Sequence, residues 1–505
     1  MDHVLELPQS VLDRARVSRD VRFDGKFFIA VTSTRIYCRP VCPVRSPKQA
    51  NVRYYATAAA AAEAGFRPCL RCRPEAAPGT PAWLGTSAVV RRALRLIHEG
   101  ALDEGSVETL ATRVGIGPRH LHRLFLQHVG ASPIAVAQTR RLHFAKRLLD
   151  ETDLPMTEVA LAAGFGSLRR FNFAFQHNYK RSPRELRLGR RRGRPVPDGD
   201  EVILRLAYRP PYDWNTLRDY LAARAVPGVE RVDARGYART IRLPKGHAIV
   251  RVTPCEGESA LELHVRGAEP SALFQLSAAA RRAFDLAADP ERIALAFKAE
   301  RTLAPLVKRN PGLRIPGSWD AFECTVRTIL GEGSVPESVR SARLSQHPLT
   351  HPSAKALARV VERAGAPIDA AADGLTHLFP AATALASASL AGLGISDARI
   401  EAIQSVARAV LDGSLDFGVG AEEAARRLAA IPGVNESTAQ YVAMRALGDP
   451  DAFPVADQAR QTRAEAWRPW RSYAALHLWH EPSAPRGVRR AVHVRKRPVR
   501  APSRR

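Results

Sequence analysis

Residues 36–42 of the chain read IYCRPVC, and residues 65–72 read GFRPCLRC. Each stretch carries one closely spaced pair of cysteines, and 26 residues separate the pairs. The four cysteines are Cys38, Cys42, Cys69 and Cys72. Two close pairs of thiols, each on a tight turn, suit the tetrahedral coordination of one Zn²⁺ ion. The sequence therefore predicts a small zinc domain, and a purely structural zinc knuckle is the alternative to a reactive site.

The chain has 505 residues, which is too long for one hydrophobic core and indicates three or four domains. Its 76 lysines and arginines outnumber 50 aspartates and glutamates, leaving a formal charge of +26. This surplus favours a polyanionic partner, although a basic protein without one is the alternative. Neither a secretory signal nor an apolar run of bilayer length is visible. We therefore expect a bacterial cytoplasmic protein with no membrane partner, in which clustered cysteines bind metal rather than form disulfides.

Changes in periodicity along the chain indicate five segments. Helical spacing dominates the second, alternating runs typical of strands begin near residue 200, and helical spacing returns after residue 300. The predicted segments are 1–78, 85–188, 200–295, 300–480 and a basic disordered tail, 481–505, with a linker at residues 74–81. We expect a multidomain, mainly α protein. Its parts are a small α+β zinc domain, an all-α double helix-turn-helix domain, an α+β antiparallel-sheet domain and an all-α helix-hairpin-helix domain.

The cysteine stretches, together with Asp24-Gly25 and Asn51-Val52, resemble the N-terminal domain of the bacterial Ada adaptive-response family. The resemblance covers roughly residues 5 to 75. It implies that Cys38 is both a zinc ligand and the acceptor of a methyl group from an Sp-methylphosphotriester in DNA. Zinc keeps thiols deprotonated, and the thiolate is the nucleophile. Nearby basic side chains are candidate contacts to the DNA backbone: Arg35, Arg39, Arg45, Lys48, Arg67 and Arg71.

Two stretches, beginning at Val107 and at Met156, have the spacing of helix-turn-helix units. Gly115 and Gly164 lie where the turn between two helices requires a left-handed residue. Pro118 favours a first helical turn, and Ser167 is a candidate helix cap. The apolar spacing alone fits any helical bundle as well.

The doubled unit, closed by Arg-Ser-Pro at residues 181–183, resembles the AraC family of DNA-binding domains. The resemblance implies two recognition helices in successive major grooves of double-stranded DNA. The candidate contacts are Arg119, His120, His122, Arg123, Ser167, Leu168, Arg169 and Arg170. An activator of this kind has a promoter operator and RNA polymerase as expected partners.

Residues 208–214, YRPPYDW, and 228–230, GVE, resemble the N-terminal domain of AlkA-type 3-methyladenine DNA glycosylase II. Residues 428–439 look like a helix-hairpin-helix, in which backbone amides of Gly433, Val434 and Asn435 approach a DNA phosphate. Family members carry a second glycine at position 435, so we expect Asn435 to adopt a positive φ there.

The resemblance to the helix-hairpin-helix glycosylase superfamily implies three further site residues. Asp457 matches its essential aspartate, which stabilises positive charge on the deoxyribose or orients water. Tyr441 and Trp479 match positions that line the base pocket, and aromatic faces attract cationic alkylated bases. Gln440 and Tyr441 follow Ala439 where bifunctional members place a lysine, which implies hydrolysis without a lyase step.

Two stretches depart from the glycosylase pattern. Residues 332–352 show no apolar wedge or amphipathic helix, and the usual helix between Asp457 and Arg463 is missing. The leading hypothesis is a methyl-activated regulator joined to a monofunctional alkylbase glycosylase, with one zinc ion as cofactor. One rival is a transcription factor with an inactive glycosylase remnant. A second rival is a structural zinc protein that binds DNA without methyl transfer.

Overall fold

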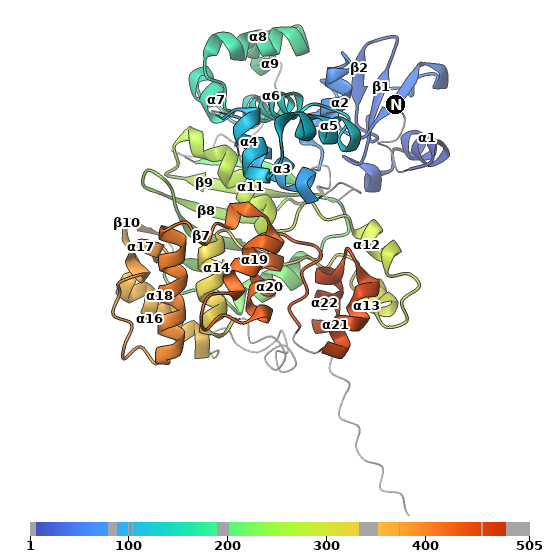
Figure 1. Cartoon of the computed structure of the whole chain (residues 1–505). Helices are drawn as coiled ribbons and strands as arrows, with labels where there is room; N and C mark the ends of the chain where they lie inside the picture. The colour runs from blue at the N-terminus through green and yellow to red at the C-terminus, as the bar shows by residue number, and fades with distance from the viewer. Residues whose placement is uncertain are drawn as a thin grey trace, which may run out of the picture.

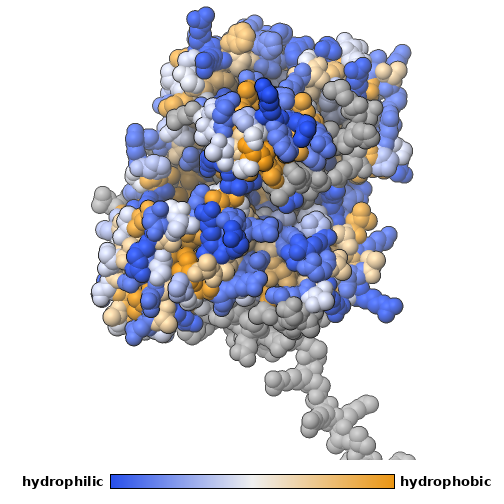
Figure 2. Space-filling model, viewed as in Figure 1, coloured by the Kyte–Doolittle hydropathy of each residue, from blue (hydrophilic) through white to orange (hydrophobic). Residues whose placement is uncertain are grey.

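The computed structural model describes residues 7–78, 88–98, 100–103, 105–188, 201–332, 352–372, 374–455 and 458–480. The expected multidomain, mainly α architecture is confirmed. In Figure 1 a small blue sheet and a group of teal helices lie above a green sheet, and orange and red helices form the lower layer. On the face shown in Figure 2, hydrophilic residues predominate and apolar residues lie in small patches. Among the described helices, none is both long and apolar enough to cross a bilayer.

The N-terminal domain is a four-stranded sheet in the order β3-β1-β2-β4. β1 pairs antiparallel with β2 and β3, whereas β2 and β4 are parallel, with Tyr37 opposite Pro68. This parallel pair brings the ends of two distant segments together, just where the cysteines follow. The elements are α1 (Gln9–Ser18), η1 (Val21–Phe23), β1 (Phe28–Val31), β2 (Ile36–Cys38), η2 (Gln49–Asn51), β3 (Val52–Tyr55), α2 (Ala58–Glu63), β4 (Arg67–Pro68) and η3 (Pro74–Ala76).

The predicted linker at residues 74–81 is wrong in its first part. Pro74 and Glu75 are buried in η3, and the pKa of Glu75 is raised because burial disfavours its charged form. The Lys146 ammonium of the following domain lies 3.6 Å from the Glu75 carboxylate. The segment therefore packs against its neighbour, because its carboxylate has a cationic partner there.

The next region holds two helix-turn-helix units joined by one long helix. Gly115 and Gly164 have φ of +80° and +81°, as the turns were predicted to need. Pro118 stands in the first turn of its helix, and the Ser167 hydroxyl accepts a hydrogen bond from the Arg170 amide. These predictions are confirmed. The helices are α3 (Ala88–His98), α4 (Val107–Val114), α5 (Pro118–His128), α6 (Pro133–Glu151), α7 (Met156–Ala162), α8 (Leu168–Tyr179) and α9 (Pro183–Leu188).

A five-stranded antiparallel sheet in the order β5-β9-β8-β7-β6 follows, as the alternating runs predicted. Along β8, Ala248, Val250 and Val252 are buried and their neighbours are not, because successive side chains point to opposite faces. The elements are β5 (Val202–Ala207), α10 (Trp214–Ala222), β6 (Glu230–Asp233), β7 (Gly236–Arg242), β8 (His247–Pro254), β9 (Ala260–Arg266), η4 (Pro270–Ala272), α11 (Leu273–Ala283) and α12 (Pro290–Ala296).

The C-terminal region is helical, with a small ribbon of β10 (Pro367–Ala372) and β11 (Leu375–His377) that the sequence did not predict. The prediction that no helix lies between Asp457 and Arg463 is wrong, because α21 (Gln458–Ala464) occupies this place. The other elements are α13 (Leu303–Arg309), α14 (Ala321–Arg327), η5 (Thr328–Glu332), α16 (Pro352–Ala364), α17 (Ala382–Leu385), α18 (Asp397–Leu411), η6 (Phe417–Val419), α19 (Ala421–Ala429), α20 (Glu436–Arg445), η7 (Glu465–Trp467) and α22 (Arg471–Trp479).

The second helix-turn-helix unit and the large sheet share one hydrophobic core. The Phe144 ring on α6 meets the Phe274 ring on α11 edge to face, at 4.9 Å between centroids. Arg147 of α6 donates to the carbonyl oxygen of Arg205 on β5 at 2.5 Å. The same cluster of buried residues continues through both regions, including Leu148, Phe171, Phe175, Tyr179, Leu204, Leu206, Val250, Leu263 and Phe284. The two regions are therefore packed as one body.

Buried ion pairs connect the large sheet to the C-terminal helices. Arg239 on β7 donates to the Glu323 carboxylate on α14 at 2.6 Å, with both side chains under 5% exposed. Arg327 donates to the Glu230 carboxylate on β6 at 2.9 Å. Buried charges are tolerated when each has a partner, so these pairs hold the sheet against α14 in one arrangement.

Candidate metal centre and base pocket

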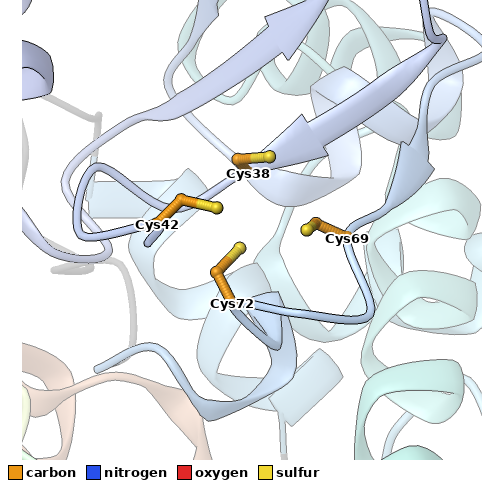
Figure 3. Close-up of side chains that lie close together, drawn as sticks. All are labelled: Cys38, Cys42, Cys69 and Cys72. Carbon is orange, nitrogen blue, oxygen red and sulfur yellow. The ribbon is translucent and has the colours of Figure 1, made fainter. Parts of the chain in front are cut away.

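Four thiols converge in the N-terminal domain. Cys38 ends β2, Cys42 follows in the adjoining loop, Cys69 comes directly after β4, and Cys72 closes the next turn. The Cys69 amide donates to the Tyr37 carbonyl oxygen at 3.0 Å, which continues the parallel pairing into the site. Figure 3 shows the four sulfur atoms turned toward one another, and all lie within 4.8 Å of each other. The sequence prediction that these four residues form one cluster is confirmed.

The cluster fits a zinc ion by its donor set and its size. In tetrahedral coordination with bonds of about 2.3 Å, sulfur atoms lie about 3.8 Å apart. The observed separations are within reach of this value, and the four donors are all thiols. Within the described residues no other group of three or more candidate ligands is found. The residues present therefore fit a structural or reactive Zn(Cys)₄ centre.

Without a cation, the four thiols shift one another's pKa in opposite directions. A hydrogen bond with the Cys42 thiol raises the pKa of Cys38 above the ordinary value for a thiol. A hydrogen bond with the Cys38 thiol raises the pKa of Cys72 in the same way. Hydrogen bonds from Cys38 lower the pKa of Cys42 and Cys69, whose negative charge is then shared across the cluster. Four thiolates in this space require a divalent cation at their centre.

Backbone amides distinguish the sulfurs. The Arg39 amide donates to the Cys72 sulfur at 3.3 Å. Amides of Val44 and Cys72 donate to the sulfurs of Cys42 and Cys69 and contribute to lowering their pKa. For Cys38, the described residues supply no such donor.

The Arg39 side chain, a candidate contact to the DNA backbone, is engaged within the domain. Its guanidinium pairs with the Asp24 carboxylate, through Nε at 2.9 Å and through Nη2, and its Nη1 donates to the Cys72 carbonyl oxygen at 3.0 Å. Only 16% of the side chain is exposed. Arg39 therefore braces the turn that carries Cys72.

The zinc domain contacts both of its neighbours. The Tyr37 hydroxyl and His143 Nε2 on α6 share a hydrogen bond of 2.9 Å, and burial lowers the pKa of His143 to about 4. On the side of the large sheet, buried Lys26 lies 2.9 Å from the Asp289 carboxylate, and Arg209 Nε donates to the Asp24 carbonyl oxygen at 3.1 Å. Tyr37, which precedes Cys38, thus contacts the helix-turn-helix region, and Asp24, which pairs with Arg39, contacts the sheet domain.

The predicted DNA-contact residues of the helix-turn-helix units lie on the surface. The exposed candidates are Arg119, His120, His122, Arg123, Ser167, Leu168, Arg169 and Arg170. The Ser167 hydroxyl oxygen accepts a hydrogen bond from the Arg170 amide and thereby caps α8, so its structural role is the cap. The remaining polar candidates stand at the start and middle of α5 and α8, where a recognition helix meets base edges.

The hairpin between α19 and α20 differs from the prediction at two positions. Gly433 has φ of +84°, and an added Cβ would lie 2.8 Å from the Ala402 side chain. Asn435 has φ of −87° and is the N-cap of α20, accepting a 2.7 Å hydrogen bond from the Thr438 amide. The expected positive φ at Asn435 is therefore wrong. The Val434 amide closes the hairpin on Ile431 at 3.0 Å, which leaves the exposed Gly433 and Asn435 as the outward residues.

Tyr441 and Trp479 lie together, as the base-pocket prediction requires. Their ring centroids are 6.3 Å apart at an interplanar angle of 49°. A third aromatic residue, Tyr220 on α10, was not predicted: its hydroxyl is 2.8 Å from the Tyr441 hydroxyl. Arg445 donates to the Tyr441 hydroxyl at 3.3 Å and covers the faces of both tyrosine rings. Asp457 lies outside the described residues, as does nearly all of the predicted departure at 332–352.

Comparison with known proteins assigns each of these regions. The metal-binding domain of Ada matches residues 12–75, a helix-turn-helix domain matches 110–189, and the AlkA N-terminal domain matches 203–320. A probable bifunctional transcriptional activator/DNA repair enzyme AlkA from Mycobacterium tuberculosis is 40% identical over 486 residues, covering 92% of this chain and 95% of that protein.

Two shorter relatives match the two halves. The DNA-3-methyladenine glycosylase 2 of Escherichia coli is 34% identical over 293 residues, which cover 54% of this chain and 96% of the relative. The bifunctional transcriptional activator/DNA repair enzyme AdaA of Bacillus subtilis is 30% identical over 174 residues, which cover 34% and 80% respectively. With its Cys₄ cluster, paired helix-turn-helix units and glycosylase-type helices, the chain belongs to the family of DNA-binding bifunctional transcriptional activators and DNA repair enzymes that join an Ada-type regulator to an AlkA-type glycosylase.

Proposed function

We propose that Cys38 irreversibly accepts the methyl group of a methylphosphotriester in double-stranded DNA. The observation that carries the proposal is the convergence of four sulfurs, of which Cys69 and Cys72 are buried and Cys38 is partly exposed. Amide hydrogen bonds stabilise charge on the other three sulfurs and reduce their nucleophilicity. Cys38 is then the most reactive thiolate of the set.

The transfer is a direct displacement at the methyl carbon. The Cys38 sulfur lone pair forms a C–S bond while the C–O bond breaks, and its electron pair stays on the phosphate oxygen. The products are a DNA phosphodiester and a thioether, and no proton has to move. Bound zinc supplies one thing to this chemistry: it keeps the four thiols ionised.

Methylation changes the charge of the centre and thereby its affinity for DNA. Four thiolates and one Zn²⁺ sum to −2, and alkylation of one sulfur leaves −1. Since phosphate is repelled by negative charge, we expect the methylated protein to bind a promoter operator more tightly and to activate transcription there, with RNA polymerase as its further partner. The site of this regulation is the nucleoid, in the bacterial cytoplasm.

We further propose that the C-terminal half excises alkylated bases such as 3-methyladenine by hydrolysis of the N-glycosidic bond. A flipped, cationic base would lie against the aromatic group formed by Tyr441 and Trp479, whose ring centroids are 6.3 Å apart. Asp457 would stabilise the positive charge that develops on the deoxyribose. The 34% identical glycosylase relative supports this assignment.

Mass spectrometry tests the methyl transfer. After incubation with DNA that carries methylphosphotriesters, the zinc-loaded full chain should gain one methyl group on Cys38, and Cys38→Ser should gain none. Methylation of another cysteine, or of none, would contradict the proposal and favour a structural zinc site.

Release of 3-methyladenine from methylated DNA tests the glycosylase. Asp457→Asn should reduce the rate by about a hundredfold or more. Equal, background-level release by both proteins would leave a transcription factor with an inactive glycosylase remnant as the function of the chain.

A further inference from the structure

The two recognition helices present the same face with different chemistry. Counted from their N-caps, Gly117 and Ser167, α5 and α8 bury corresponding positions, Leu121 with Phe171 and Phe125 with Phe175. The exposed and half-buried positions also follow in the same order through the first eleven residues of each helix. The two helices are therefore equivalent, position by position, in what they turn toward solvent.

This equivalence pairs Arg119 with Arg169 and His120 with Arg170, which are exposed nitrogen-bearing side chains in both helices. Two exposed positions follow the buried Leu121 and Phe171, and the second of them breaks the pattern, because Arg123 on α5 corresponds to Phe173 on α8. At the same place on the surface, one unit offers a guanidinium and the other offers an apolar ring.

Phe173 is 71% exposed, although phenylalanine is among the residue types most often buried. Its ring stacks on that of His177, one turn further along α8, with centroids 5.9 Å apart and an interplanar angle of 20°. The stack holds the ring on the outer face, between the exposed arginines of the first turn and the C-terminal turn.

We propose that Phe173 determines specificity by contacting the C5-methyl group of a thymine in the major groove. The thymine methyl is the apolar feature that distinguishes this base in the major groove, whereas arginine pairs with guanine O6 and N7. The two units consequently select different sequences: Arg123 reads a guanine in one half-site, and Phe173 reads a thymine in the other. The operator is therefore asymmetric. This inference rests on the proposed operator binding.

Selection from a random duplex library by the purified, zinc-loaded full chain, methylated beforehand with methylphosphotriester DNA, gives the binding motif. Binding is then compared between the selected duplex and the same duplex with uracil replacing single thymines, which removes only the methyl group. For wild type we expect one position in the second half-site where uracil weakens binding by about threefold to fivefold, the effect of one buried methyl.

Phe173→Ala should abolish this thymine-to-uracil difference, while Phe173→Leu, which keeps an apolar side chain, should retain part of it. The matched control is Arg123→Ala, which should relax a guanine preference in the first half-site and leave the uracil effect unchanged. Because Phe173 is exposed, melting curves of its variants should match wild type.

An unchanged thymine-to-uracil ratio in Phe173→Ala would overturn the proposal, and loss of transcriptional activation in the same variant would then identify a protein partner at this surface. A library that yields no motif at all would instead overturn operator recognition as a whole. The two failures are thus distinguishable.

Discussion

The cysteine cluster and the proposed base pocket are built over very different distances along the chain. All four cysteines lie within residues 38–72, in one domain with its own sheet. Tyr220 and Tyr441 of the pocket are 221 positions apart and come from different domains. The first site depends on local spacing and on metal, whereas the second depends on how well two domains are held together.

Loss of one zinc ligand should have the largest effect. Cys69→Ala leaves three sulfurs, and structural zinc binding is worth on the order of 10 kcal/mol or more. We expect loss of stoichiometric zinc, of the N-terminal sheet and of methyl acceptance, measured by metal analysis, circular dichroism and mass spectrometry. Cys255→Ser, outside the cluster, should change none of these. If the Cys69→Ala protein still held zinc and accepted methyl, the cluster would not depend on all four sulfur ligands.

The pocket should instead respond to the ion pairs between the domains. Arg239→Met removes the 2.6 Å partner of the buried Glu323 carboxylate, which then keeps only Arg327 at 3.1 Å, at a cost of about 3 kcal/mol. We expect a lower urea midpoint and slower base release, with zinc content and methyl acceptance unchanged. The control is Arg205→Met, whose partner Glu258 is half exposed, and which should cost less than about 1 kcal/mol. If the two substitutions lowered the free energy of unfolding equally, burial of an ion pair would not be what makes its loss costly.

Acid should weaken the half that carries the pocket through His477 on α22. Burial lowers the pKa of His477 to about 4, against 6.5 in an unfolded chain, with a smaller contribution from His480. Because the unfolded state binds the proton first, this stability is present above pH 6.5 and is lost as the pH falls toward 4, by up to about 3 kcal/mol. His477→Leu should flatten this part of the profile of unfolding free energy against pH. If the profile of His477→Leu ran parallel to that of wild type, groups other than His477 would cause the acid sensitivity.

The smallest effect is expected at the hairpin cap. Asn435→Ala removes the hydrogen bond to the Thr438 amide and should cost about 1 kcal/mol, whereas Asn435→Gly should cost only a few tenths. Thermal melting measures both. If glycine proved the more damaging substitution, the cap would not be what fixes Asn435.

The separation of contacting residues along the chain also explains which features could be predicted from the sequence. The four ligands followed from spacing, and Gly115, Gly164 and Ser167 from turn and cap chemistry, because each depends on neighbours a few residues away. Tyr220 escaped prediction because its partner is remote in the chain. Asn435 was misjudged because asparagine serves both positive-φ turns and caps, and the Thr438 amide decides between them.

Arg39 and Phe173 show where spacing is enough and where it is not. Arg39 is a basic residue beside the cysteines, and only the three-dimensional position of Asp24 reveals that it is held inside the domain. Phe173 lies two positions from Phe171 and from Phe175, so helical spacing already places it off the face that these two rings bury, and it is 71% exposed. Helical spacing therefore predicts which side of α8 meets solvent, whereas it does not reveal an ion pair with a residue elsewhere in the chain.

The core that α6 and α8 share with the large sheet makes the stability of the regulatory half depend on the glycosylase half. Cutting the chain between them would strip the second DNA-binding unit of its apolar support, so neither half can be discarded without harming the other. Selection for gene control alone would then preserve the sheet, even in a lineage that no longer needed base excision.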